Sequence, residues 1–67
     1  MSFADILKQY DLTGYQLAKT TGIKQQTISK YCTKESNPLN MSFTNASKIS
    51  KALGITMDEL FELLSTP

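Results

Sequence analysis

The side chains with the richest hydrogen-bonding chemistry in this sequence lie close together in residues 25–33 (QQTISKYCT). A Gln amide can make paired hydrogen bonds to adenine N6 and N7, a Lys can donate to guanine O6 and N7, and Ser or Thr can serve a base or a phosphate. At about 100° per residue on a helix, Ile28 and Tyr31 fall on one side. The other side carries Gln25, Gln26, Ser29, Lys30 and Thr33. We expect the first side to be buried and the second to fit a major groove.

The remaining composition argues against catalysis. The chain has no His and a single Cys, Cys32, which excludes an intrachain disulfide, a zinc cluster and His-based acid–base chemistry. Because no nucleophile is paired with a base, we expect no enzymatic activity, no cofactor, no metal and no small-molecule substrate. Cys32 is interpreted as an apolar filler at a helix edge rather than a redox switch, since only Lys30 and Lys34 nearby would lower its pKa.

Length and charge limit the partners. With 67 residues the chain has room for one core, so we expect a single domain over residues 1–67. A domain this small is marginally stable alone, which makes a homodimer an expectation. The net charge is only +1, but all seven Lys lie in residues 1–56, and the tail is acidic at Asp58, Glu59 and Glu62. Without a leader sequence or long apolar window, we expect a cytoplasmic protein with no membrane partner.

The pattern predicts an all-α chain with no strand and with five helices at about residues 3–10, 14–21, 25–32, 43–53 and 57–64. Ser2 precedes the first helix, and T-x-x-Q and T-x-x-E capping boxes begin at Thr13 and Thr56. Gly22 and Gly54 are expected to end two helices. These signals predict where each helix begins or ends, but not how the helices pack.

Residues 33–42 (TKESNPLNMS) are rich in turn-forming types and are predicted to be a surface loop. Ser42 is expected to cap the next helix, which would direct four apolar side chains inward: Phe43, Ala46, Ile49 and Leu53. Near the end of the chain, Leu63 and Leu64 are compatible either with a dimer contact or with the edge of the core.

Residues 13–31 therefore contain a helix, a glycine corner at Gly22 and a second helix with almost no linker. Ile23, directly after the corner, is expected to fill the gap between the two helices. This is the helix-turn-helix arrangement, in which the second helix is presented to the major groove.

Two segments of the chain resemble a known family. Residues 17–30 (LAKTTGIKQQTISK) resemble the helix-turn-helix of the lambdoid phage repressor and Cro group. Residues 49–60 (ISKALGITMDEL) are similar to the stretch that joins the fourth and fifth helices of the same group. The resemblance covers nearly the whole chain and implies a compact five-helix bundle of the lambda-repressor type.

The resemblance also implies roles for particular residues. Four would read bases, namely Gln25, Gln26, Ser29 and Lys30. Seven would contact phosphates, namely Gly14, Tyr15, Lys24, Thr27, Lys34, Asn37 and Asn40. The chain departs from the family pattern in having Lys24 where a Ser or Thr cap is common, Cys32 and Thr33 in place of an acidic-Asn-Gly ending, and no Arg.

Two functions follow as hypotheses. In the first, the protein is a sequence-specific regulator of transcription, a repressor of phage or mobile-element character, that binds double-stranded DNA as a symmetric pair on two half-sites. In the second, it is a protein-binding module with the same fold that modulates a repressor or another partner, as an antirepressor does. The weak net charge and the absence of Arg favour the second hypothesis slightly.

Overall fold

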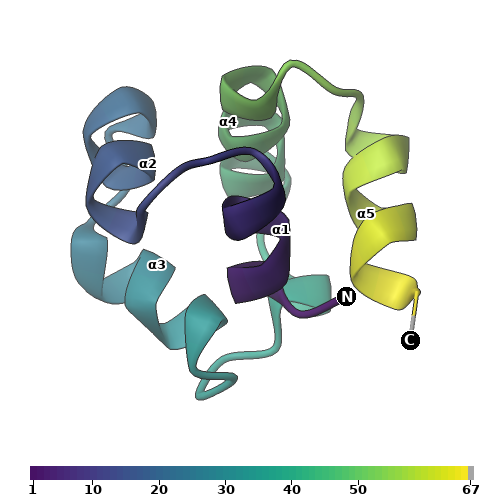
Figure 1. Cartoon of the computed structure of the whole chain (residues 1–67), viewed down its shortest axis with the longest axis horizontal. Coiled ribbons are helices and arrows are strands. Elements are labelled where there is room, and N and C mark those ends of the chain that lie inside the picture. The colour runs from purple at the N-terminus through teal and green to yellow at the C-terminus, as the bar shows by residue number, and fades with distance from the viewer. Residues whose placement is uncertain (67) are drawn as a thin grey trace.

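The computed structural model of the protein describes residues 1–66 and contains, within them, five α-helices, one short 3-10 helix and no strand (Figure 1). The elements follow the order α1 (Phe3–Gln9), α2 (Gly14–Thr21), α3 (Gln25–Cys32), η1 (Pro38–Asn40), α4 (Phe43–Leu53) and α5 (Met57–Ser65). The expected all-α fold class with five helices is confirmed. Compared with the sequence expectation, α1 ends one residue earlier, α5 continues one residue further, and η1 lies inside the predicted loop.

Side-chain caps explain why four of the helices begin where they do: Ser2, Thr13, Ser42 and Thr56. At α2, Thr13 Oγ1 accepts from the Gln16 backbone N–H at 3.1 Å, and Gln16 Oε1 accepts from the Thr13 N–H at 3.0 Å. Such caps satisfy N–H groups that a helix start leaves unpaired, and each contributes about 1 kcal/mol. Helix α3 is the exception, because Lys24 at its N-cap makes no side-chain cap.

The corner between α2 and α3 depends on Gly22. Its φ of 77° is left-handed, a conformation that costs glycine little and other residues more. Its N–H donates to the Ala18 carbonyl at 2.8 Å, and the Ile23 N–H then donates to Thr21 Oγ1 at 3.2 Å. Ile23 is buried directly after the turn, as its apolar type predicts. Gly22 and Ile23 together fix the direction in which α3 leaves α2.

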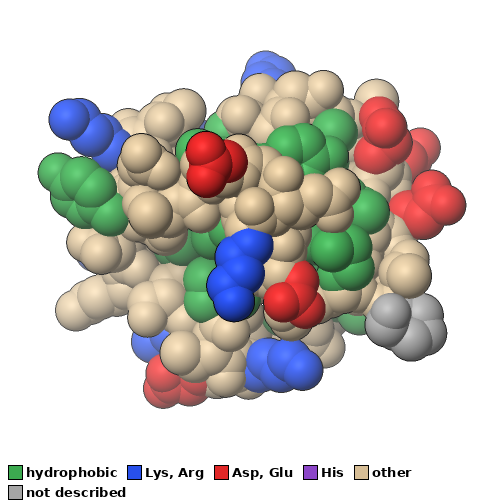
Figure 2. All heavy atoms as spheres, in the orientation of Figure 1, with side chains coloured by type: hydrophobic (Ala, Val, Ile, Leu, Met, Phe, Trp, Pro, Cys, Tyr) green, Lys and Arg blue, Asp and Glu red, His purple; other side chains and the backbone are tan. Residues whose placement is uncertain are grey.

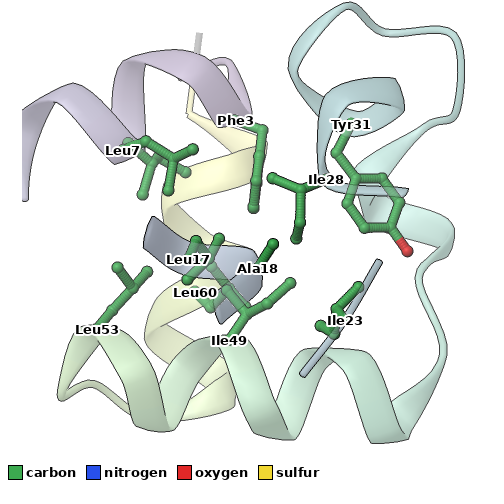
Figure 3. Close-up of a cluster of buried hydrophobic side chains, with 11 residues drawn as sticks. Phe3, Leu7, Leu17, Ala18, Ile23, Ile28, Tyr31, Ile49, Leu53 and Leu60 are labelled. Atoms are coloured by element: carbon green, nitrogen blue, oxygen red, sulfur yellow. The ribbon is translucent and has the colours of Figure 1, made fainter. Parts of the chain in front are cut away.

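All five helices contribute to one hydrophobic core (Figure 3). Its fully buried large side chains are Phe3, Ile6, Leu17, Ile28, Ile49 and Leu60. Fully burying one such side chain contributes about 1.5–3 kcal/mol. Within residues 1–66, movement of any one helix away from the others would therefore expose part of this shared cluster.

Tyr31 anchors the C-terminal end of α3. Its ring packs edge-on against Phe3, with centroids 5.6 Å apart and planes at 65°. Its hydroxyl accepts a hydrogen bond from Asn45 Nδ2 at 3.3 Å, so the polar end of a buried ring has a partner. Through Tyr31, α3 is tied to both α1 and α4.

The inward direction expected for Phe43 is wrong. Its side chain is 74% exposed, whereas Ala46, Ile49 and Leu53 are buried as expected. Phe43 is the first residue of α4, and helical side chains tilt toward the N-terminus, so its ring extends past the end of the helix instead of over the core. The buried face of α4 is completed by Ser50, whose hydroxyl donates to the Ser47 carbonyl at 3.0 Å.

Cys32 is half-buried and packs against the edge of the core. Burial raises the pKa of its thiol, because the thiolate would lose hydration there. A raised pKa lowers the thiolate fraction at neutral pH and thus the reactivity of the sulfur. This environment agrees with the interpretation of Cys32 as a packing residue.

Helix length also bears on membrane association. Among residues 1–66, no helix is both long and apolar enough to span a bilayer.

Candidate nucleic-acid interface

The polar side of α3 faces solvent. Gln25, Gln26, Ser29 and Lys30 are all exposed, and they line one open hollow on the surface together with Glu35. No other helix covers them, and α5 lies on the far side of the molecule from α2 and α3 (Figure 1). The four side chains predicted to read bases therefore form one continuous, accessible surface.

The opposite side of α3 keeps this surface in place. Ile28 and Tyr31 are buried, with exposed fractions of 0% and 6%, and Thr27 is half-buried between the two sides. A Cβ placed on Gly14 would lie 3.4 Å from Ile28 Cγ2, so the start of α2 closely approaches the middle of α3. Because 3.4 Å is an ordinary van der Waals distance, the two helices already pack as closely at this point as a residue with a Cβ would allow.

The N-terminus of α2 offers hydrogen-bond donors. The capping box satisfies the N–H of Gln16, while helical geometry gives the N–H groups of Gly14 and Tyr15 no partner within the helix. Free N–H groups at a helix start, together with the helix dipole, favour an anion such as a phosphate. The Tyr15 side chain is 59% exposed beside them and can also donate through its hydroxyl.

The residues of the loop after α3 are arranged differently. Lys34 and Asn37 line a second hollow, whose other walls include Met1 and Leu64, and they do not share the hollow of α3. Asn37 Oδ1 accepts from the Leu39 N–H at 3.0 Å, which leaves its amide N–H₂ as the free donor. Asn40 is exposed at the end of η1, and Lys24 is exposed directly before α3.

Charge is unevenly distributed over the surface. Asp58, Glu59 and Glu62 all belong to α5, and Figure 2 shows acidic side chains gathered over this helix at the right of the view. Lys side chains belong to other elements, including Lys24 and Lys30 at α3. The acidic group of α5 is therefore separated from the polar side of α3, and it does not repel an anionic partner at close range.

Glu35 also belongs to this surface, although nothing in the sequence pattern indicates it. It lies in the loop, and only the path of the backbone after α3 brings it beside Gln25 and Lys30. No pattern of residue types in the loop predicts such a return.

The sequence matches the model of a known protein family. The model of the Cro/C1-type HTH DNA-binding domain matches residues 3–64. The chain belongs to this family. The Cro/C1-type domain thus spans every helix of the structure except the final residue of α5, and the helix-turn-helix expected from the sequence is α2, the Gly22 corner and α3.

Membership assigns this Cro/C1-type domain to a class of DNA-binding domains that regulate transcription. The resemblance to the lambdoid repressor and Cro group, noted in residues 17–30 and 49–60, is confirmed by it. No match was found among curated proteins or among solved structures.

Proposed function

We propose that this Cro/C1-type domain recognises a specific sequence in double-stranded DNA by placing α3 in the major groove. The observation that carries the proposal is the uncovered polar surface of Gln25, Gln26, Ser29 and Lys30, held outward by a buried Ile28. Gln amides pair with adenine and Lys with guanine, so this surface can distinguish base pairs by hydrogen bonding.

Phosphate contacts set the register of α3 on the duplex. Their sources are the free N–H groups of Gly14 and Tyr15, the side chains of Lys24 and Thr27 at the first turn of α3, and the loop residues Lys34, Asn37 and Asn40. With few cations and no Arg in the chain, one copy binds with modest affinity.

Modest affinity of one copy is the reason to propose a pair. Two copies related by a twofold axis would occupy half-sites about one helical turn apart and add their contacts. The biological role that fits such a binder is a transcriptional repressor of phage or mobile-element type, which acts in the cytoplasm or nucleoid without a cofactor.

A second candidate function is a protein-binding module that modulates a repressor, as an antirepressor does. The observations that favour it are the net charge of only +1, the presence of Glu35 in the hollow of α3 and the separate acidic surface of α5. In this case the polar side of α3, or α5, would contact a protein.

Titration with duplex DNA separates the two functions. Fluorescence anisotropy with a labelled random-sequence duplex, at about 50 and about 200 mM salt, should show affinity that falls by roughly 0.9 log units per log unit of salt for each phosphate contacted. An acidic protein of similar size serves as the control for nonspecific signal. Absence of binding at the lower salt concentration would support the protein-binding module instead.

A further inference from the structure

The chain turns back on itself directly after α3. Lys34 has a left-handed φ of 64°, which reverses the backbone. The Lys34 N–H donates to the Tyr31 carbonyl at 3.4 Å, and the Ser36 N–H donates to the Lys30 carbonyl at 3.2 Å. Because both acceptors belong to the last turns of α3, these bonds hold residues 34–36 against that helix.

Glu35 lies between the two bonded residues of this turn. Its side chain is exposed and lines the same hollow as Gln25, Gln26, Ser29 and Lys30, where it is the only acidic residue. The backbone bonds on both sides of Glu35 restrict where its carboxylate can reach. Any molecule that fills the hollow of α3 must therefore come close to a negative charge.

A carboxylate at this place has two opposite effects on the affinity of the protein for DNA. It can only accept hydrogen bonds, so in the major groove it can pair with the N4 amino group of cytosine but not with the O6 and N7 acceptors of guanine. Adenine also offers an amino group, N6, but its N7 acceptor lies beside that group and repels a carboxylate, so cytosine is the preferred partner. The carboxylate also repels phosphates of any sequence and lowers the general affinity. The second effect weakens binding to every sequence, and the first offsets this loss only where a cytosine lies within reach.

We propose that Glu35 is a specificity-determining residue, which accepts a hydrogen bond from cytosine in the major groove and lowers affinity for sequences without a cytosine at that position. This inference rests on the proposed function, since it applies only if α3 enters DNA. It assigns a base-reading role to the loop after α3, where the family resemblance implied phosphate contacts only.

Three proteins test the proposal: the wild type, Glu35→Gln and Glu35→Asp. Each is used to select bound duplexes from a random pool, and affinities are then measured for selected sites and for random duplex. Glu35→Gln removes the charge, so we expect a severalfold gain in affinity for random duplex. The new amide can donate as well as accept and can therefore pair with adenine, so we also expect a loss of about tenfold in the preference for cytosine at one position. Glu35→Asp keeps the charge on a shorter side chain, so the cytosine preference should fall without any gain for random duplex.

The matched control is Glu62→Gln, which makes the same charge change at an exposed position of α5. A gain for random duplex as large as that of Glu35→Gln would show that net charge alone acts, and would overturn the proposal. If wild type and Glu35→Gln select the same site with the same base preferences, the proposal for Glu35 is also overturned. DNA reading by α3 would remain intact in that case. A wild type that binds no duplex would instead refute the proposed function itself, and thermal melting verifies that each variant is folded.

Discussion

At the scale of the residue, neighbouring side chains of α3 have opposite surroundings. Ile28 is completely buried, whereas Ser29 and Lys30 beside it are exposed. A buried position contributes to the free energy of folding, and an exposed one can be changed with an effect of usually less than about 0.5 kcal/mol. Substitutions on the exposed side therefore separate binding from stability.

Replacement of Gln25 by Ala should lower sequence preference while leaving the fold intact. If Gln25 makes paired hydrogen bonds to a base, its loss costs about 1–3 kcal/mol of discrimination at one base pair. Competition between duplexes that differ at single positions measures this change. Gln9→Ala, an exposed amide on α1, is the control and should change nothing. Equal weakening on every sequence would contradict a base-reading role for Gln25.

At the scale of the element, α3 begins without the cap that the other four helices have. The Lys24 side chain cannot accept a hydrogen bond, and its positive charge lies at the positive end of the helix dipole. The helix that carries the candidate reading surface thus begins at a locally unfavourable residue. The compensating benefit would be a cation beside a phosphate.

Lys24→Ser should therefore raise stability and weaken DNA binding together. Since a Ser can cap α3, we expect a gain of about 0.5–1 kcal/mol in the free energy of unfolding. Loss of the Lys24 charge should reduce the salt dependence of DNA binding by the equivalent of about one phosphate contact. Urea denaturation and salt titration measure the two changes. In the control Thr13→Ala, loss of the α2 capping box should lower stability by about 1 kcal/mol. Unchanged salt dependence in Lys24→Ser would remove Lys24 from the phosphate contacts.

The sequence predicts the starts of four helices, the Gly22 corner and the Cro/C1-type family, because each of these depends on residues that lie close together in the chain. Thr13 with Gln16 forms its capping box within one helical turn, and Gly22 acts through its own φ. The inward direction expected for Phe43 was wrong because apolar spacing does not show that a side chain in the first turn can extend beyond the N-terminal end of its helix. Glu35 was missed because its place depends on a left-handed conformation at Lys34, a residue type that seldom adopts it.

At the scale of the whole molecule, the single core makes stability and function depend on the same contacts. Leu17 of α2, Ile28 of α3 and Ile49 of α4 belong to one cluster. A chain of this size is expected to be stable by only about 0.05–0.15 kcal/mol per residue. One severe core substitution can therefore unfold the entire protein.

Ile28→Ala should cause such unfolding. Truncation of a buried Ile costs about 2–5 kcal/mol, which is comparable to the whole expected stability. Circular dichroism should show a large fall in melting temperature, with helix content and DNA binding lost together. Phe43→Ser is the control, because an exposed ring contributes little to the core and its replacement should leave melting nearly unchanged. Loss of α3 alone, with the other helices retained, would contradict a single cooperative core.

The N-terminal ammonium of Met1 donates hydrogen bonds to the carbonyl oxygens of Leu63 and Thr66, so the two ends of the described chain meet beside α5 (Figure 1). A short peptide linker could join them into a ring, and the ring could be reopened at the exposed Asp11, between α1 and α2, to give a circular permutant. That rearranged protein would keep α2 and α3 on one uninterrupted stretch of backbone. A reporter inserted in that linker would lie beside α5, on the side of the fold away from α2 and α3.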